Sequence, residues 1–172
     1  MIIDVVIILI SIINTLVRLL PVGLYSGAII SGLVFNDFRA NLLFIGFLVN
    51  ELVSFAYKVS MKKGSKQECA LLADPSNFYT LPSSITQTVG FFFGFMLADT
   101  YFQNSFTSMK FIVLCFIMAF TIFSRVNVGC EDTLGGLIFA SLGTAFGMLY
   151  YYIIKPYYKA NLDDIETDDD LL

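Results

Sequence analysis

Long apolar runs separated by short polar segments make up most of the chain. Because the runs are continuous, they predict helices that cross a membrane, whereas the strands of a membrane β-barrel would show alternating polarity. A helix needs about 20 apolar residues to cross a hydrocarbon core of about 30 Å. The run Val22–Phe35 is shorter than that, so we expect a short or re-entrant second helix there. The predicted helices are Ile2–Leu20, Val22–Phe35, Asn41–Tyr57, Pro82–Tyr101, Lys110–Phe123 and Asp132–Ile154.

The composition excludes a soluble domain. Of 172 residues, 57% are hydrophobic and only 14% are charged, whereas the surface of a soluble domain carries far more charge. The sequence therefore predicts an all-α, multi-pass membrane helical bundle of about six transmembrane helices over residues 1–157, with both termini on one side. Pro156 is expected to end the last helix. An acidic, flexible C-terminal tail is expected at residues 158–172.

Small residues recur at four-residue intervals in several of the predicted helices. In a membrane such rows let a neighbouring helix approach closely, because little side chain separates the two backbones. We therefore expect these rows to mark helix–helix contacts within the bundle. The rows are Gly23, Gly27 and Ser31; Gly90, Gly94 and Ala98; Gly136 and Ala140; and Gly143 and Gly147.

The chemistry available to the chain is limited. It has no histidine, which removes the usual general base near neutral pH and the commonest metal ligand. Its three cysteines lack the spacing of a zinc site, so we expect neither a metal nor another cofactor. A disulfide between Cys69 and Cys130 is expected only if their side of the membrane is oxidising. The expected partners are membrane lipids and proteins of a membrane assembly, not nucleic acid.

Polar residues gather where the third, fourth and sixth predicted helices meet the same side of the membrane. They are Lys58, then Pro82-Ser83-Ser84, then Ser124-Arg125 and Glu131-Asp132. Basic side chains and the free N–H groups of a helix start suit a phosphate. The alternative is that Lys58 and Arg125 only extend toward the interface while their stems stay in lipid.

The order of these clusters resembles the type 2 phosphatidic acid phosphatase superfamily (PAP2), especially its dolichyl-diphosphatase-like branch. Asn50-Glu51 precedes Lys58 as in that branch, Pro82–Gln87 is similar to its second motif, and Ser124-Arg125-Val126 followed by Gly129 and Glu131 is similar to its third. The resemblance covers about residues 41–152. It implies a helical bundle that hydrolyses lipid phosphates, with a nucleophilic histidine and an acidic histidine.

This chain departs from the family at the catalytic positions. The resemblance places the nucleophile at Glu131, the acid at Ile85 and the orienting aspartate at Gly135, and the Arg-Pro of the first motif falls on Ser65-Lys66. Isoleucine cannot donate a proton, and general acid–base catalysis is typically worth about 10² to 10⁴-fold in rate. No catalytic residue is therefore assigned.

Several residues that hold the phosphate in the family are retained. The phosphate-binding candidates are Lys58, Ser83, Ser84, Ser124 and Arg125. A lone buried charge is costly, so we expect Glu131 to pair with Arg125 and Lys58 rather than to leave a working phosphate pocket.

The sequence thus favours a catalytically inactive PAP2-like integral membrane protein with a structural or interaction role, for example in a viral or organelle membrane. One alternative is a protein that binds a phospholipid or isoprenoid-phosphate headgroup. Another is a residual lipid phosphatase or diphosphatase that uses Glu131 as a carboxylate nucleophile. A transporter or channel is a weaker alternative, because few charges lie within the predicted spans.

Overall fold

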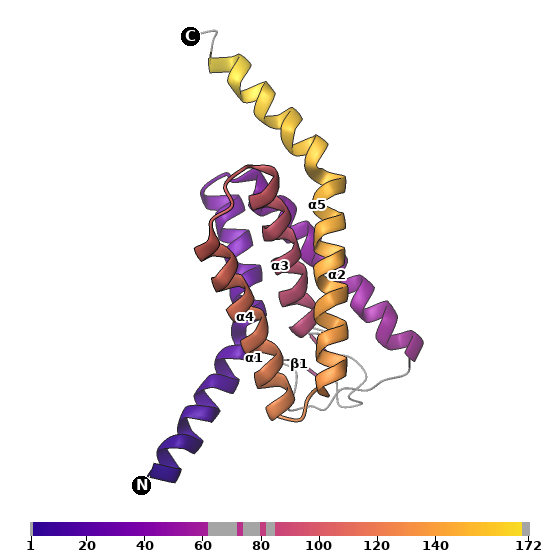
Figure 1. The fold of residues 1–172 in the computed structure, drawn as a ribbon. Coiled ribbons are helices and arrows are strands. Elements are labelled where there is room, and N and C mark those ends of the chain that lie inside the picture. Colours follow the sequence, from indigo (N-terminus) through magenta and orange to yellow (C-terminus); the bar gives the residue numbers. More distant parts are fainter. Residues whose placement is uncertain (1, 62–71, 74–79, 82–84, 170–172) are drawn as a thin grey trace.

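The computed structural model describes residues 2–61, 72–73, 80–81 and 85–169, and this part of the chain is almost entirely helical (Figure 1). Two short strands pair antiparallel, with Leu72 opposite Leu81. The elements are α1 (Ile2–Val34), α2 (Phe38–Met61), β1 (Leu72–Ala73), β2 (Thr80–Leu81), α3 (Ile85–Phe102), α4 (Ser108–Asn127) and α5 (Thr133–Asp169).

The first two predicted helices form one continuous helix, α1, with Pro21 inside it. The prediction of a separate short or re-entrant helix over Val22–Phe35 is therefore wrong. Pro21 is fully buried, and a proline inside a helix removes one backbone hydrogen bond. Ending the helix in apolar surroundings would leave several N–H and C=O groups without partners. Continuing through the proline is the less costly solution.

This merger changes the topology. With five helices in the described chain, the start of α1 and the end of α5 lie at opposite ends of the bundle (Figure 1). The expectation that both termini share one side is therefore wrong. α5 also continues past Pro156 to Asp169, so this proline does not end the last helix.

Within the described residues, four of the helices contain segments long and apolar enough to cross a membrane, and a count of six spans is not supported. The remaining helix, α3, lies in the middle of the bundle and packs against each of the others (Figure 1). Protein surrounds α3 on most sides, so it can carry polar residues without exposing them to lipid. The four segments are Ser11–Val34, Phe38–Tyr57, Ser108–Asn127 and Thr133–Tyr157.

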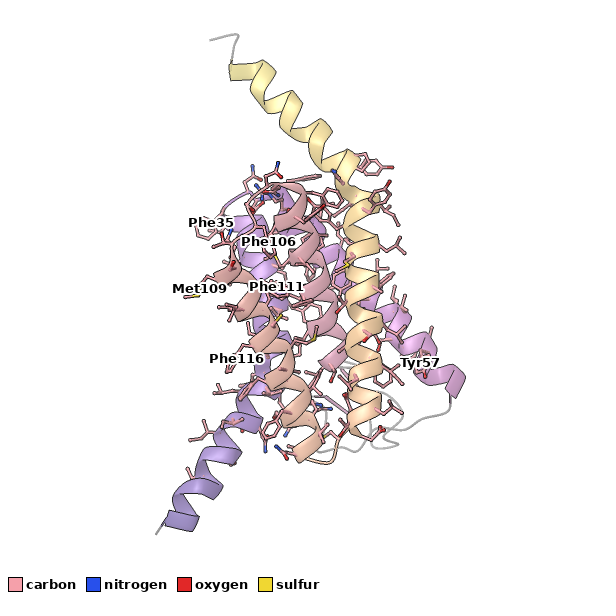
Figure 2. The ribbon with its side chains drawn as sticks, in the orientation of Figure 1. Phe35, Tyr57, Phe106, Met109, Phe111 and Phe116 are labelled. Carbon is pink, nitrogen blue, oxygen red and sulfur yellow. The ribbon has the colours of Figure 1, made fainter. Side chains whose placement is uncertain are left out.

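Large apolar side chains cover the outside of the bundle. Phe35, Met109 and Phe116 are 74%, 69% and 67% exposed, and Figure 2 shows such side chains projecting outward along the helices. Soluble monomers rarely expose continuous apolar surface of this kind, which marks contact with lipid or with another protein. The surface therefore agrees with helices placed in a membrane.

Aromatic side chains hold α3 between α2 and α5. The ring centroids of Phe47 on α2 and Phe91 on α3 are 5.6 Å apart, and those of Phe95 on α3 and Tyr151 on α5 are 5.3 Å apart. All four residues are buried in one cluster. Such aromatic pairs stabilise a fold beyond the effect of their buried area.

Small residues bring the backbones of α3 and α5 together, whereas the sequence predicted contacts at these rows without indicating which helices meet. A Cβ atom added at Gly94 would overlap the carbonyl of Thr144, and one added at Gly143 would overlap the carbonyl of Gln87. Only glycine allows an approach this close. Helix–helix contact is therefore confirmed for Gly90, Gly94, Gly143 and Gly147, whereas Gly136 faces Ile122 of α4.

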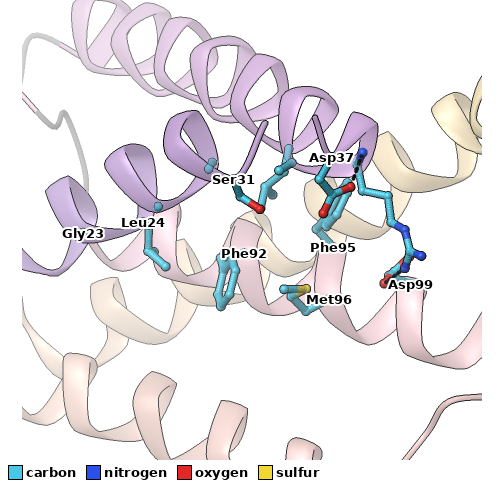
Figure 3. Close-up of a pocket in the computed structure, with 13 residues that line it drawn as sticks. Gly23, Leu24, Ser31, Asp37, Phe92, Phe95, Met96 and Asp99 are labelled. Carbon is cyan, nitrogen blue, oxygen red and sulfur yellow. Dashed lines mark hydrogen bonds and ion pairs between the residues drawn. The ribbon is translucent and has the colours of Figure 1, made fainter. Parts of the chain in front are cut away.

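The small-residue row of α1 has a different environment. A Cβ atom added at Gly23 or Gly27 would meet no atom within 4 Å. The row instead lines a cavity of about 360 Å³ between α1, α2 and α3, whose opposite wall includes Phe92 and Met96 (Figure 3). The expectation of a helix contact within the bundle is wrong for this row.

Candidate functional site

A buried ion pair lies at one end of the bundle. Arg125, on the last turn of α4, faces Glu131 of the α4–α5 turn, with 3.8 Å between Nε and Oε1. The two side chains are only 8% and 12% exposed. In such surroundings each charge compensates the desolvation of the other. The predicted pairing of Glu131 with Arg125 is confirmed.

The α4–α5 turn places Glu131 under the end of α4. The turn bends back at Gly129, whose φ of 72° is in the left-handed region that glycine adopts without strain. Three successive N–H groups satisfy carbonyls of the last turn of α4, as is typical of a helix C-terminus. These bonds run from Val128 to Ser124, from Gly129 to Val126 and from Cys130 to Arg125.

Both oxygens of the Glu131 carboxylate have partners. The hydroxyl of Thr86, which is fully buried in the first turn of α3, donates a hydrogen bond of 2.6 Å to Oε2 while Oε1 faces Arg125. Arg18 of α1 lies close enough to Arg125 for the two positive charges to interact. The carboxylate thus joins α3 to α4, and Arg18 of α1 adds a second positive charge near Arg125.

A retained family serine also serves to join helices. The hydroxyl of Ser124 donates a hydrogen bond of 2.8 Å to Oδ1 of Asn14 on α1. Ser124 is buried, and a buried hydroxyl needs such a partner to offset its desolvation. In this structure Ser124 therefore ties α4 to α1.

A second polar layer lies between α1, α2 and α3. Nε2 of Gln87 donates to Oδ1 of Asn50 at 3.1 Å, and the Tyr25 hydroxyl donates to Oε2 of Glu51 at 3.3 Å. The same hydroxyl has a hydrogen bond with Thr88. The amide nitrogen Nδ2 of Asn50 is buried without a partner, an arrangement that costs about 1–3 kcal/mol.

The first turn of α3 therefore lies at the centre of the hydrogen bonds and ion pair described above, which we call the polar cluster. Three consecutive residues contact three different elements: Thr86 the α4–α5 turn, Gln87 helix α2, and Thr88 helix α1. Successive helical residues point about 100° apart, so one turn of a central helix can reach several neighbours.

Two of the predicted catalytic positions, Ile85 and Gly135, have no side chain that could donate or accept a proton. Ile85 is buried in an apolar cluster with Val17 and Val89. Gly135 lies in the first turn of α5, where an added Cβ would press against the carboxylate of Asp132. Within the described residues, no group of three His, Cys, Asp or Glu side chains is placed to hold a metal ion.

The side chains of the remaining phosphate-binding candidates lie outside the described part of the structure. Lys58 lies in α2, but its side chain is outside the described part of the structure, and so are Ser83 and Ser84. The pairing of Lys58 with Glu131 therefore stays a prediction.

Several members of the polar cluster were not predicted from the sequence. The sequence pattern does not single out Asn14, Arg18 or Tyr25, and it singles out Asn50-Glu51 only by its spacing from Lys58. Their signal is a polar residue inside an apolar run, as Asn14 and Arg18 are inside Ile2–Leu20. Polar residues at such positions face the bundle interior and pair with one another.

Covalent chemistry also restrains this end of the bundle. Cys130, the residue before Glu131, is disulfide-bonded, whereas Cys115 in α4 is a free thiol. Cys69, the third cysteine of the sequence, lies outside the described residues, so its predicted pairing with Cys130 stays a prediction.

Comparison of the chain with protein-family models, with curated proteins and with solved structures finds no match. The resemblance to the PAP2 superfamily therefore rests on the residues of the motifs alone.

Proposed function

We propose that this chain is a multi-pass integral membrane protein of the PAP2-like type that has lost catalysis and has a structural or interaction role in a membrane assembly. The observation that supports this proposal best is the buried Arg125–Glu131 ion pair. In the family these two positions supply a phosphate-binding arginine and the nucleophile.

Phosphoryl transfer would require Glu131 to give up its present contacts. A carboxylate attacks phosphorus through a free oxygen, but one oxygen of Glu131 faces Arg125 and the other accepts a hydrogen bond from Thr86. Nearby, Ile85 has no proton to donate to a leaving group. The arrangement therefore supports a stabilising role for Glu131 more strongly than a catalytic one.

Binding of a lipid phosphate at the same position meets a related obstacle. A phosphate would have to replace Glu131 beside Arg125 and leave the carboxylate buried next to another anion. Separating a buried ion pair is strongly unfavourable because a charge is left uncompensated. This alternative, like residual phosphatase activity, is therefore less well supported than the inactive role.

The outer surface of the chain favours an interaction role. Apolar side chains cover the described helices (Figure 2), and such a surface contacts lipid or another membrane protein. Expected partners are membrane lipids and other membrane proteins, as in the membrane of a virus particle or an organelle.

Two measurements on the same variant test the proposal. The full chain is reconstituted in vesicles that contain phosphatidic acid or an isoprenyl diphosphate, and phosphate release and the unfolding temperature are measured. We expect the wild type and Glu131→Gln to release no more phosphate than protein-free vesicles, while Glu131→Gln unfolds at a lower temperature.

Asp132→Asn is the matched control because Asp132 is an exposed neighbour of Glu131. It is expected to leave the unfolding temperature unchanged. Phosphate release by the wild type that Glu131→Gln abolishes would overturn the proposal. For the interaction role, crosslinking in the native membrane before extraction is expected to recover a complex, and recovery of the monomer alone contradicts it.

A further inference from the structure

A groove opens between α3 and α4 at the other end of the bundle from Arg125 and Glu131. Its volume is about 600 Å³. It adjoins the cavity of Figure 3, because Arg39, Met96 and Asp99 line both. None of its residues belongs to the polar cluster described above, so the groove is a separate feature of the molecule.

The groove is polar at one end and apolar along its length. At the end of the bundle it is lined by Arg39, Gln103, Ser105 and Lys110. Val113 and Leu114 follow about one turn further along α4, and Met96 lies about two turns back along α3, at about 1.5 Å per residue. A ligand that fills this groove must itself have a polar end and an apolar end.

Among the residues that line the groove, the accessible charges are positive, while the exposed carboxylate of Asp37 lines the adjoining cavity instead. Arg39 donates from Nη1 to Oε1 of Gln103 at 2.8 Å and lies 3.7 Å from the Asp99 carboxylate. These contacts hold the guanidinium in place, yet the Arg39 side chain is 43% exposed whereas that of Asp99 is 13% exposed. The cation is thus the accessible member of the pair.

A second cation lies across the groove from Arg39. Lys110 is exposed in the first turn of α4, and its ammonium donates to the carbonyl of Ser105 at 3.3 Å. An ammonium has three N–H donors, so one backbone contact leaves capacity for an anionic ligand. Arginine and lysine together are common partners of phosphate oxygens.

We propose that this groove binds one anionic phospholipid. Its phosphate lies between Arg39 and Lys110, and an acyl chain packs against Met96, Val113 and Leu114. The lipid-facing position of the groove supports this occupant, because Met109 at its edge is 69% exposed on the outer surface of the bundle. A lipid enters such a groove sideways from the bilayer, without crossing any barrier.

The test uses the full chain in detergent, titrated with phosphatidylserine or with phosphatidylcholine of the same acyl chains, and bound lipid is counted by native mass spectrometry. We expect a preference for phosphatidylserine in the wild type. The double variant Arg39→Gln and Lys110→Gln is expected to lose that preference at least about tenfold, because it removes two charge-assisted contacts.

Lys155→Gln is the matched control. Lys155 is a cation at the same end of the bundle, but it lies 3.8 Å from the centroid of the Phe102 ring and does not line the groove. It is expected to keep the wild-type preference. An equal loss in Lys155→Gln would show that general positive charge, and not this groove, attracts the lipid, and would overturn the proposal.

Two further arms separate a lipid groove from a simple anion site. Val113→Trp fills the apolar part without changing any charge, and it is expected to weaken binding of both lipids while circular dichroism stays that of the wild type. Inorganic phosphate is expected not to displace bound phosphatidylserine. Displacement by phosphate, unchanged binding in Val113→Trp, or equal affinity for the two lipids would each overturn the proposal. None of these outcomes depends on whether the other end is catalytically inactive.

Discussion

Two arginine–carboxylate pairs lie at opposite ends of the bundle. Arg125 and Glu131 are 3.8 Å apart and nearly inaccessible, while Arg39 and Asp99 are 3.7 Å apart and the arginine is 43% exposed. The chemistry and the distances are almost the same, and the two carboxylates are similarly buried, at 12% and 13% exposed, so the exposure of the arginine is the difference. At the first end the pair is part of the protein interior, and at the second it borders two open cavities.

The distance between the charged atoms does not by itself show what an ion pair does. In a buried pair, removing one partner leaves an uncompensated charge. In an exposed pair, water or lipid headgroups replace the lost partner and the interaction contributes little. We therefore assign a stabilising role to Arg125 and a ligand-binding role to Arg39.

The largest expected effect is at the buried pair. Arg125→Ala should lower the free energy of unfolding by about 3–5 kcal/mol, because Glu131 stays buried without its partner. The measurement is unfolding in detergent followed by circular dichroism. Replacing both residues, Arg125→Met with Glu131→Leu, should restore much of the loss. A loss below about 1 kcal/mol for Arg125→Ala would place this pair in the same class as Arg39 and Asp99.

The disulfide at Cys130 should give the next largest effect. Cys130→Ser is expected to cost about 2–4 kcal/mol of stability, whereas Cys115→Ser should change stability by less than about 1 kcal/mol. Thiol labelling of the untreated protein should detect one reactive cysteine, and reduction should expose all three. Disulfides persist in oxidising compartments. Three reactive thiols before reduction would contradict the disulfide bond of Cys130.

Thr86→Val tests whether the first turn of α3 stabilises the end of the bundle that contains Arg125 and Glu131. Hydrogen bonds to charged groups contribute about 1.5–3 kcal/mol, so the loss of the bond to Glu131 should lower stability by that amount. Thr100→Val is the control, because Thr100 lies on the same helix at the end of the bundle that contains Arg39 and Asp99. Its hydroxyl bonds the carbonyls of Met96 and Leu97 in its own helix, so the expected change is within about 0.5 kcal/mol. Equal losses in both variants would remove the distinction between the two ends.

The glycine rows give a comparison of packing rather than charge. Gly94→Leu should destabilise the fold by about 1–3 kcal/mol, because the side chain would enter the contact between α3 and α5. Gly27→Leu should be nearly neutral, because it faces open space. Thermal unfolding of the two variants measures the difference. Similar losses would mean that the row on α1 is also closely packed.

The smallest effect is expected at the exposed pair. Arg39→Ala should change the free energy of unfolding by no more than about 1 kcal/mol, since the exposed guanidinium contributes little and Asp99 keeps its hydrogen bonds with Gln103 and Tyr151. The same unfolding measurement in detergent applies. A loss as large as that of Arg125→Ala would show that Arg39 stabilises the fold rather than holding a lipid.

The sequence by itself predicted an all-α bundle of apolar helices, because continuous apolar runs allow no other membrane structure. It also predicted that the small-residue rows mark helix–helix contacts and that Glu131 pairs with Arg125. Each of these follows from a strong local rule: glycines at four-residue spacing permit close approach, and a buried charge needs a partner.

The contacts that these helices make depend on the tertiary structure. The path of α1 through Pro21 depends on surroundings that the local sequence does not contain, and so does the open space beside Gly23 and Gly27. The roles of Thr86, Gln87 and Thr88 likewise come from the central place of α3 between four neighbours. The sequence marks which residues are polar or small, but distance in three dimensions determines which of them meet.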